Sequence, residues 1–203
     1  MTELGRLVDP AHTVLITQEC QNGSMGSDAL WPALADAASS AIPNISKLVH
    51  AARSAKVPIV HCLVAKRPDF LGSNANAPLF APARRSGGLQ LGSHAAALID
   101  EIGPDPTDII ITRTHSVSPL AGTGLDATLR NLGARTIVVA GVSVNVAIPS
   151  ATMDAVNAGY RVVIPRDAVA GVPPDYADSV LTHTLSLLAS VVSTQDLLEV
   201  WKG

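Results

Sequence analysis

Residues 136–148 read Thr-Ile-Val-Val-Ala-Gly-Val-Ser-Val-Asn-Val-Ala-Ile, and this stretch decides the fold. A run of β-branched residues ends at Gly141-Val142, and a helical pattern begins a few residues later. α/β enzymes often place a nucleophile at such a junction, because the first N–H groups of the helix have no partner within it and can hold an oxyanion. Ala147 occupies that position here and offers only a methyl group.

The rest of the chain repeats the same alternation of short apolar runs with longer alanine- and leucine-rich stretches. This pattern is typical of βαβ units around a parallel sheet that is buried on both faces. We therefore predict a three-layer α/β/α, Rossmann-like fold with a six-stranded, mainly parallel sheet. Strands are expected at 13–17, 58–63, 108–112, 136–140, 160–164 and 190–193, and helices at 33–55, 93–102, 124–132, 146–158 and 175–188. Pro43 should break or kink the first helix.

Residues 65–92 show no clear periodicity and contain glycine, proline, asparagine and two adjacent arginines. A structureless segment of this length inside a compact domain is usually functional or disordered. Because it follows the carboxyl end of a predicted strand, where open α/β sheets bind ligands, it is a candidate lid or inter-subunit arm. A solvated loop is the equally weighted alternative.

Composition sets the broad class. The 203 residues favour a single domain spanning 1–203, and 47% hydrophobic with 15% charged residues indicates a well-filled core. A net charge of −3 without any run of Lys or Arg argues against nucleic-acid partners. No apolar segment approaches the roughly 20 residues of a membrane span, and the N-terminal residues lack the pattern of a signal peptide. We expect a cytoplasmic protein with Cys20 and Cys62 reduced.

Further motifs follow the opening stretch. The chain reads Asp-Ala-Val-Asn-Ala-Gly-Tyr at 154–160, Arg-Val-Val-Ile-Pro at 161–165 and Asp-Ala at 167–168. Together with the Gly-Val-Ser-Val-Asn-Val-Ala turn at 141–147, they resemble the isochorismatase-like cysteine hydrolases, a family of nicotinamidases, N-carbamoylsarcosine amidase and isochorismatases. More loosely, the resemblance extends from Val14 to about Thr194. It implies the same fold and a homo-oligomer, a dimer or tetramer.

All three positions that carry catalysis in that family are altered here. An Asp ends the family's first strand, a Lys ends the third, and a Cys opens the helix after the fourth; the matching residues are Glu19, Arg113 and Ala147. Glu19 keeps a carboxyl group on a longer side chain, whereas the Arg113 guanidinium stays protonated and cannot exchange a proton at neutral pH. Without a sulfur at Ala147, thiol catalysis at this position is excluded.

Other residues are expected near the same crevice. His115 and His61 are candidate substrate-binding residues, because they lie close to the ends of predicted strands. The resemblance implies a cis peptide near Val142-Ser143, and with it an anion site at the N–H groups of Val146 and Ala147. Ser143 and Val146 are further candidate substrate-binding residues. The histidine spacings do not indicate a metal site, so no metal and no cofactor are expected.

Two functions stay open. The first is a hydrolase that acts on a small carboxylate- or amide-containing metabolite without a cysteine nucleophile, with Glu19 as its acid/base. The isochorismatase branch implies one such route, in which a carboxylic acid protonates a vinyl ether and water adds to the resulting oxocarbenium carbon. The second is a pseudoenzyme that binds a small anion or acts as a scaffold, because all three family residues have changed.

Overall fold

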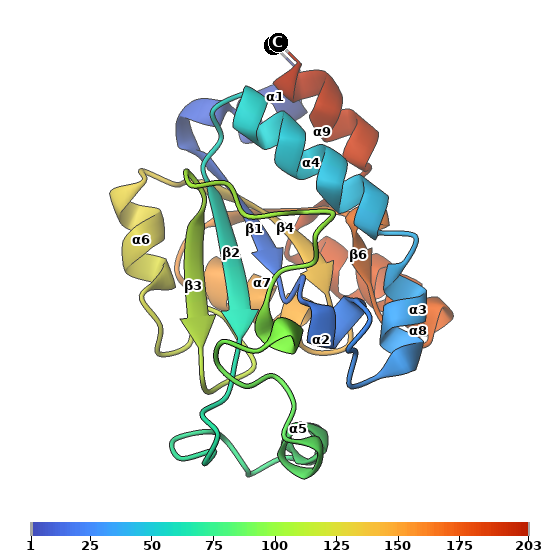
Figure 1. Cartoon of the computed structure of the whole chain (residues 1–203). Coiled ribbons are helices and arrows are strands. Elements are labelled where there is room, and N and C mark those ends of the chain that lie inside the picture. Colours follow the sequence, from blue (N-terminus) through green and yellow to red (C-terminus); the bar gives the residue numbers. More distant parts are fainter. Residues whose placement is uncertain (1, 203) are drawn as a thin grey trace.

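The computed structural model describes residues 2–202 and is built around one seven-stranded sheet (Figure 1). Six strands lie in the order β3-β2-β1-β4-β5-β7, β6 pairs with β4, and every strand pairing is parallel. The predicted mainly parallel α/β fold is confirmed. The strands are β1 (Thr13–Gln18), β2 (Ile59–Val64), β3 (Ile109–Arg113), β4 (Thr136–Val142), β5 (Arg161–Pro165), β6 (Val169–Ala170) and β7 (Ser190–Val192).

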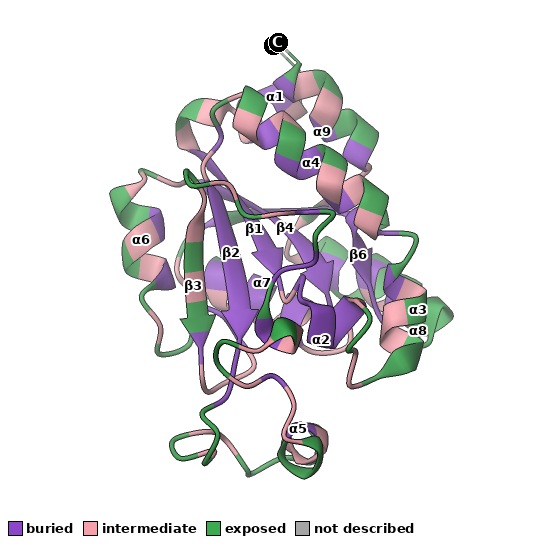
Figure 2. Cartoon of the chain, viewed as in Figure 1, coloured by how far each residue is buried: buried purple, intermediate pink, exposed green. Residues whose placement is uncertain are grey.

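Helices cover both faces of the sheet, as the alternating strand side chains require. Leu15 of β1 packs with one layer, which contains α1, α4 and α9, and its neighbour Ile16 packs with the other, which contains α6, α7 and α8. Figure 2 shows β1, β2 and β4 buried throughout. The helices are α1 (Glu3–Leu7), α2 (Asn22–Met25), α3 (Pro32–Ala38), α4 (Ile42–Ser54), α5 (Ala81–Ser86), α6 (Leu125–Asn131), α7 (Ala147–Asn157), α8 (Pro174–His183) and α9 (Thr194–Trp201).

Two details of the predicted architecture are wrong. The sheet has a seventh strand, because two residues are enough for β6 to pair beside the end of β4. The helix expected at 93–102 is only a 3-10 turn, His94–Ala96. Side chains bind the backbone of this segment instead: the amide of Gln21 donates to the carbonyl of Ala96 at 2.7 Å, and that of Asn22 donates to the carbonyl of His94 at 3.2 Å.

The stretch expected at 33–55 is divided into α3 and α4, with Pro43 in the first turn of α4. The expected break is therefore confirmed.

The segment 65–92 extends beyond the carboxyl ends of β2 and β3, at the lower end of Figure 1. It contains the 3-10 turn Pro78–Phe80 and α5. The backbone of Lys66 holds its ends together, because its N–H donates to Leu89 O at 2.7 Å and its carbonyl accepts from Leu91 N at 2.8 Å. We call residues 67–88 the insert.

Gly141 is required at the end of β4. Its φ is +113°, and a Cβ there would lie 2.2 Å from the carbonyl oxygen of Gln18 in the neighbouring strand.

We expect Gly141→Ala to lower the free energy of unfolding by at least about 2 kcal/mol, through backbone strain together with the clash. Urea denaturation measures this loss. Gly133→Ala is the control, because Gly133 also has a positive φ but nothing within 4 Å of the added Cβ; equal losses in the two variants would contradict the clash.

Candidate active site at the carboxyl ends of the strands

A cavity of about 300 Å³ opens at the carboxyl edge of the sheet. Glu19 directly follows β1, Arg113 is the last residue of β3, and Ala147 is the first residue of α7 after β4. All three line the cavity. The structure thus brings together three residues that are far apart in sequence, as the convergence of strand ends in a parallel sheet requires.

Glu19 and Arg113 form an ion pair on the cavity wall. Nη2 of Arg113 donates to Oε1 of Glu19, and the same oxygen accepts from the side-chain amide of Gln18 at 3.0 Å. The guanidinium also donates to the carbonyl oxygens of Ser116 at 3.5 Å and Val117 at 3.2 Å. These contacts fix the carboxylate and leave Arg113 almost fully buried, with 3% of its side chain exposed.

The backbone of Glu19 supports this placement at some cost. Its φ is +52°, in the left-handed region that residues other than glycine rarely adopt. The strained turn is held by two backbone bonds, from Glu19 N to Cys62 O at 2.9 Å and from Gln21 N to Glu19 O at 2.8 Å. Strained residues persist where the surrounding structure fixes them, and they gather at functional sites.

Lys66 also lines the cavity and is not among the site residues predicted from the sequence. It stands two residues beyond β2, and its Nζ donates to the carbonyl of Thr114 at 3.0 Å. The ammonium lies 6.0 Å from the centre of the Phe80 ring. Burial and then the charge of Arg113 hold the pKa of Lys66 below its ordinary value. Its position beyond a strand end, at the same edge as Glu19, is the signal that could have found it.

The start of α7 differs in part from the expected anion site. The Val142–Ser143 peptide is cis, as the resemblance implies, and Ser143 lines the cavity together with Val146. The N–H of Val146, however, donates to Ser143 O at 3.2 Å, and the N–H of Ile148 donates to the same oxygen at 3.0 Å. The turn thus gives the Val146 N–H a backbone acceptor of its own, and the role expected for it as an anion donor stays a prediction. Ala147 remains the first residue of the helix, where an N–H lacks an intrahelical partner.

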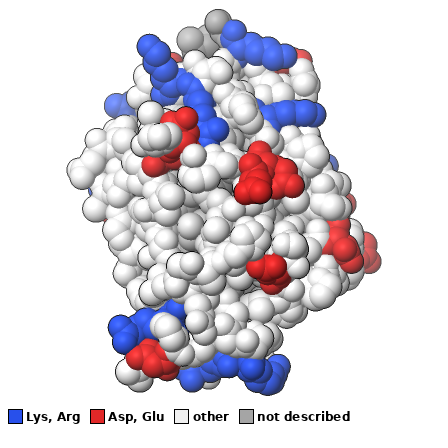
Figure 3. Space-filling view, in the orientation of Figure 1, with Lys and Arg blue, Asp and Glu red and all other residues white. Residues whose placement is uncertain are grey.

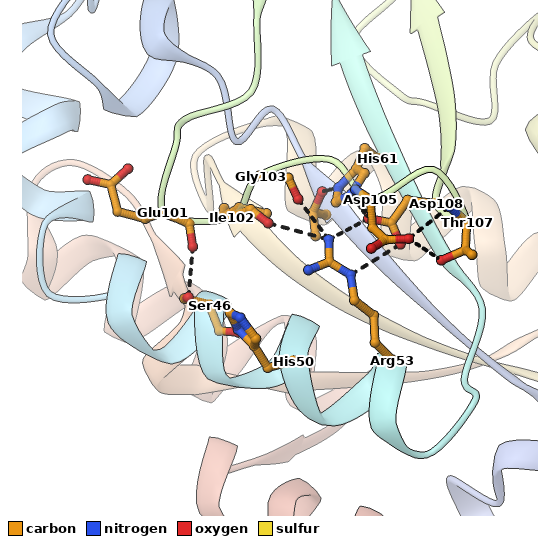
Figure 4. A network of polar contacts seen from close by, with 11 residues as sticks. Ser46, His50, Arg53, His61, Glu101, Ile102, Gly103, Asp105, Thr107 and Asp108 are labelled. Carbon is orange, nitrogen blue, oxygen red and sulfur yellow. Dashed lines mark hydrogen bonds and ion pairs between the residues drawn. The ribbon is translucent and has the colours of Figure 1, made fainter.

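His61 does not belong to the cavity. Its two ring nitrogens lie 2.6 Å from Oγ1 of Thr17 and 3.0 Å from Oδ2 of Asp108. The same carboxylate oxygen accepts from Arg53 of α4 at 2.5 Å, so the network joins the sheet to α4 (Figure 4). Burial holds the pKa of His61 below its ordinary value.

This arrangement has the residue types of a Thr–His–Asp catalytic triad, but Thr17 and His61 are both 0% exposed. No substrate reaches that hydroxyl, so we interpret the network as structural. His115 is also outside the set of cavity-lining residues; its ring packs against Gly122. The substrate-binding roles expected for both histidines are therefore not supported by their positions.

The two cysteines lie in the core. Cys20 and Cys62 are 0% exposed, and neither lines the cavity. Burial raises the pKa of the Cys20 thiol above its ordinary value and that of Cys62 to about 12. Both therefore stay protonated near neutral pH, and a thiol is a poor nucleophile in that form.

Residues 2–202 contain no group of three or more His, Cys, Asp or Glu side chains that could hold a metal ion. Across the same residues, no helix combines the length and apolar character that a membrane span needs.

Comparison with known proteins identifies the family. The Isochorismatase domain model matches residues 13–196, and the chain therefore belongs to the isochorismatase family. A ureidoacrylate amidohydrolase RutB of Agrobacterium fabrum is 26% identical over 201 residues, which cover 91% of this chain and 87% of the relative. A secreted isochorismatase effector of Verticillium dahliae is 30% identical over 154 residues, covering 75% and 72%.

Solved structures agree on the fold. The crystal structure of a cysteine hydrolase from Pseudomonas syringae pv. phaseolicola superimposes with a TM-score of 0.84 at 22% identity, covering 97% of this chain and 95% of that one. N-carbamoylsarcosine amidase from Thermoplasma acidophilum gives a TM-score of 0.72 at 22% identity, covering 90% and 96%.

Proposed function

We propose that this protein is a hydrolase that acts on a small carboxylate- or amide-containing metabolite without a cysteine nucleophile. The observation that carries the proposal is the Glu19–Arg113 pair, which lines the same cavity as Ala147. Glu19 is the acid/base in this mechanism. Arg113 positions the carboxylate and supplies a fixed positive charge, because a guanidinium does not give up its proton at neutral pH.

The contacts of Glu19 favour its acting first as a base. Both hydrogen bonds to its Oε1 come from N–H donors, and one of these donors is a cation. In amide hydrolysis, water would attack the carbonyl carbon while its proton passes to Glu19. The C–N bond of the tetrahedral intermediate then breaks, and the departing nitrogen takes the proton back from Glu19. The N–H at the start of α7 is the candidate donor to the developing oxyanion.

The vinyl-ether route requires Glu19 in the opposite state, as a carboxylic acid that protonates carbon first. Oε1 of Glu19 accepts from both Arg113 and Gln18, an arrangement that suits a proton acceptor, so hydrolysis of an amide bond fits these contacts better. The names of two relatives, ureidoacrylate amidohydrolase and N-carbamoylsarcosine amidase, denote amide-cleaving enzymes and support the same choice.

A screen of ureido acids, N-carbamoyl amino acids, primary amides and enol ethers tests the proposal, with ammonia release and product NMR as readouts. We expect hydrolysis of at least one amide, at a rate that prior treatment with iodoacetamide leaves unchanged, because both thiols are fully buried. Intact mass reports any alkylation. Activity that falls in step with the alkylation of a cysteine would overturn the thiol-free mechanism.

The alternative is a pseudoenzyme that binds a small anion or acts as a scaffold. The change of all three catalytic residues of the family, at Glu19, Arg113 and Ala147, favours it. Saturable binding of compounds from the same panel without turnover of any of them would support the pseudoenzyme and contradict the hydrolase.

A homo-oligomer, either dimer or tetramer, and a cytoplasmic location also remain proposals. Large apolar side chains that are exposed in the single chain support the oligomer, among them Ile110 on β3 at 50% and Leu187 at 81%.

A further inference from the structure

We infer that the ligand of this cavity is a small apolar carboxylate and that Lys66 holds its carboxylate group. The inference rests on the proposed function only in taking the cavity as the substrate site. It concerns equilibrium binding, so it can be tested separately from turnover.

Charge balance is the first observation. Among residues 2–202, three ionisable side chains line the cavity: Lys66, Arg113 and Glu19. The Glu19–Arg113 ion pair leaves the Lys66 ammonium without a carboxylate partner among the lining residues. Lys66 is only 5% exposed as a residue, an unbalanced ammonium is costly in a site of low polarity, and a monoanionic ligand would remove the imbalance.

The unused hydrogen-bond donors point the same way. Nζ of Lys66 has three N–H donors, and within residues 2–202 its one protein acceptor is the carbonyl of Thr114. Nη1 of Arg113 is buried and has no hydrogen-bond partner in the same part of the chain. Buried donors are almost always satisfied, so unused ones on two adjacent cations indicate a missing acceptor.

The walls define the body of the ligand. Two groups of apolar side chains form them, one from residues around α2 and α3 and one from the insert and its end: Leu30, Trp31 and Leu34, and Leu79, Phe80 and Leu89. A volume of about 300 Å³ is at the small end of ligand sites. Such walls suit an aromatic ring or a branched aliphatic group and offer a sugar or a nucleotide few polar partners.

The surface around the insert is suited to attract an anion. Figure 3 shows Lys and Arg side chains at the lower end of the molecule, where Figure 1 places the insert. Arg84 and Arg85 lie in the last turn of α5, and Arg84 stacks on the Phe70 ring at 5.6 Å. Positive charge near the entrance of a site raises the local concentration of anionic ligands.

Isothermal titration with matched pairs of probes tests the inference: benzoate against benzamide, and phenylacetate against phenylacetamide. We expect the unmodified protein to prefer each carboxylate by at least about tenfold. Lys66→Met should reduce this preference to about one while retaining amide binding, and Lys66→Arg should retain most of the preference. Lys47→Met is the control, because Lys47 is exposed on α4, away from the cavity lining, and should leave the ratio unchanged.

Two outcomes would overturn the inference: no preference for carboxylates in the unmodified protein, or an undiminished preference in a folded Lys66→Met variant. If that variant fails to fold by circular dichroism, Lys66→Gln replaces it. Carboxylate binding without any turnover would count against the hydrolase and leave this inference standing. Turnover of a neutral amide without any preference for carboxylate binding would support the hydrolase and contradict this inference.

Discussion

We expect Glu19→Gln to lower kcat/KM for the hydrolysed substrate by about 10²- to 10⁴-fold, the range that removal of a general acid or base usually produces. Glutamine has nearly the same shape and can still accept from Arg113, but it cannot take a proton from water. The loss should therefore appear in kcat. Steady-state kinetics on the substrate found by the screen, together with titration of a non-hydrolysed analogue, separates kcat from binding.

Glu101→Gln is the matched control, since Glu101 is an exposed glutamate outside the cavity lining. It should keep the activity of the unmodified protein. If Glu19→Gln also kept it, Glu19 would not be the acid/base and the mechanism would be wrong.

The second large effect concerns stability. Asp108→Ala should lower the free energy of unfolding by about 3 kcal/mol, near the lower end of the range for breaking a buried ion pair. The aspartate side chain is 2% exposed and accepts from Arg53, His61 and the N–H of Asp105. Removing it leaves three donors without this acceptor. Because the Arg53 side chain is 24% exposed, water can hydrate its guanidinium in the variant, which limits the loss of unfolding free energy.

Urea denaturation measures this effect, and Asp178→Ala is its control. Asp178 also pairs with an arginine, Arg166, but both side chains are largely exposed, so the loss should be much smaller. Equal losses in the two variants would show that the buried network adds no stability beyond that of a surface pair.

The strands of the fold could be predicted because β-branched runs in a doubly buried sheet carry a strong local signal. The exceptions depend on contacts distant in sequence. β6 is a strand only because Val169 and Ala170 pair with the last two residues of β4. The 93–102 stretch forms no α-helix, and two of its carbonyl groups accept from Gln21 and Asn22, more than 70 residues earlier.

The site shows the same division. Motif spacing placed Glu19, Arg113 and Ala147 at strand ends, and the sheet topology brings strand ends together. His61 was assigned to the cavity because its strand leads there. The pleat of β2 instead turns the His61 ring toward Thr17 and Asp108. Predicting that orientation requires the register of β1, β2 and β3, which the sequence alone does not give. Lys66 follows the end of β2 by two residues, but a strand-end position alone does not distinguish a cavity-lining lysine from a solvated one.

The insert leaves the sheet at Lys66 and is tied back to the same residue by the bonds to Leu89 and Leu91. A loop whose two ends meet at one residue can change in length or sequence without displacing the strands that carry it. In this protein, one wall of the cavity comes from that loop, whereas Glu19, Arg113 and Ala147 come from the sheet edge and the start of α7. One wall of the cavity is thus structurally separable from the sheet edge that carries Glu19 and Arg113, so exchanging the loop would change that wall without moving these two residues.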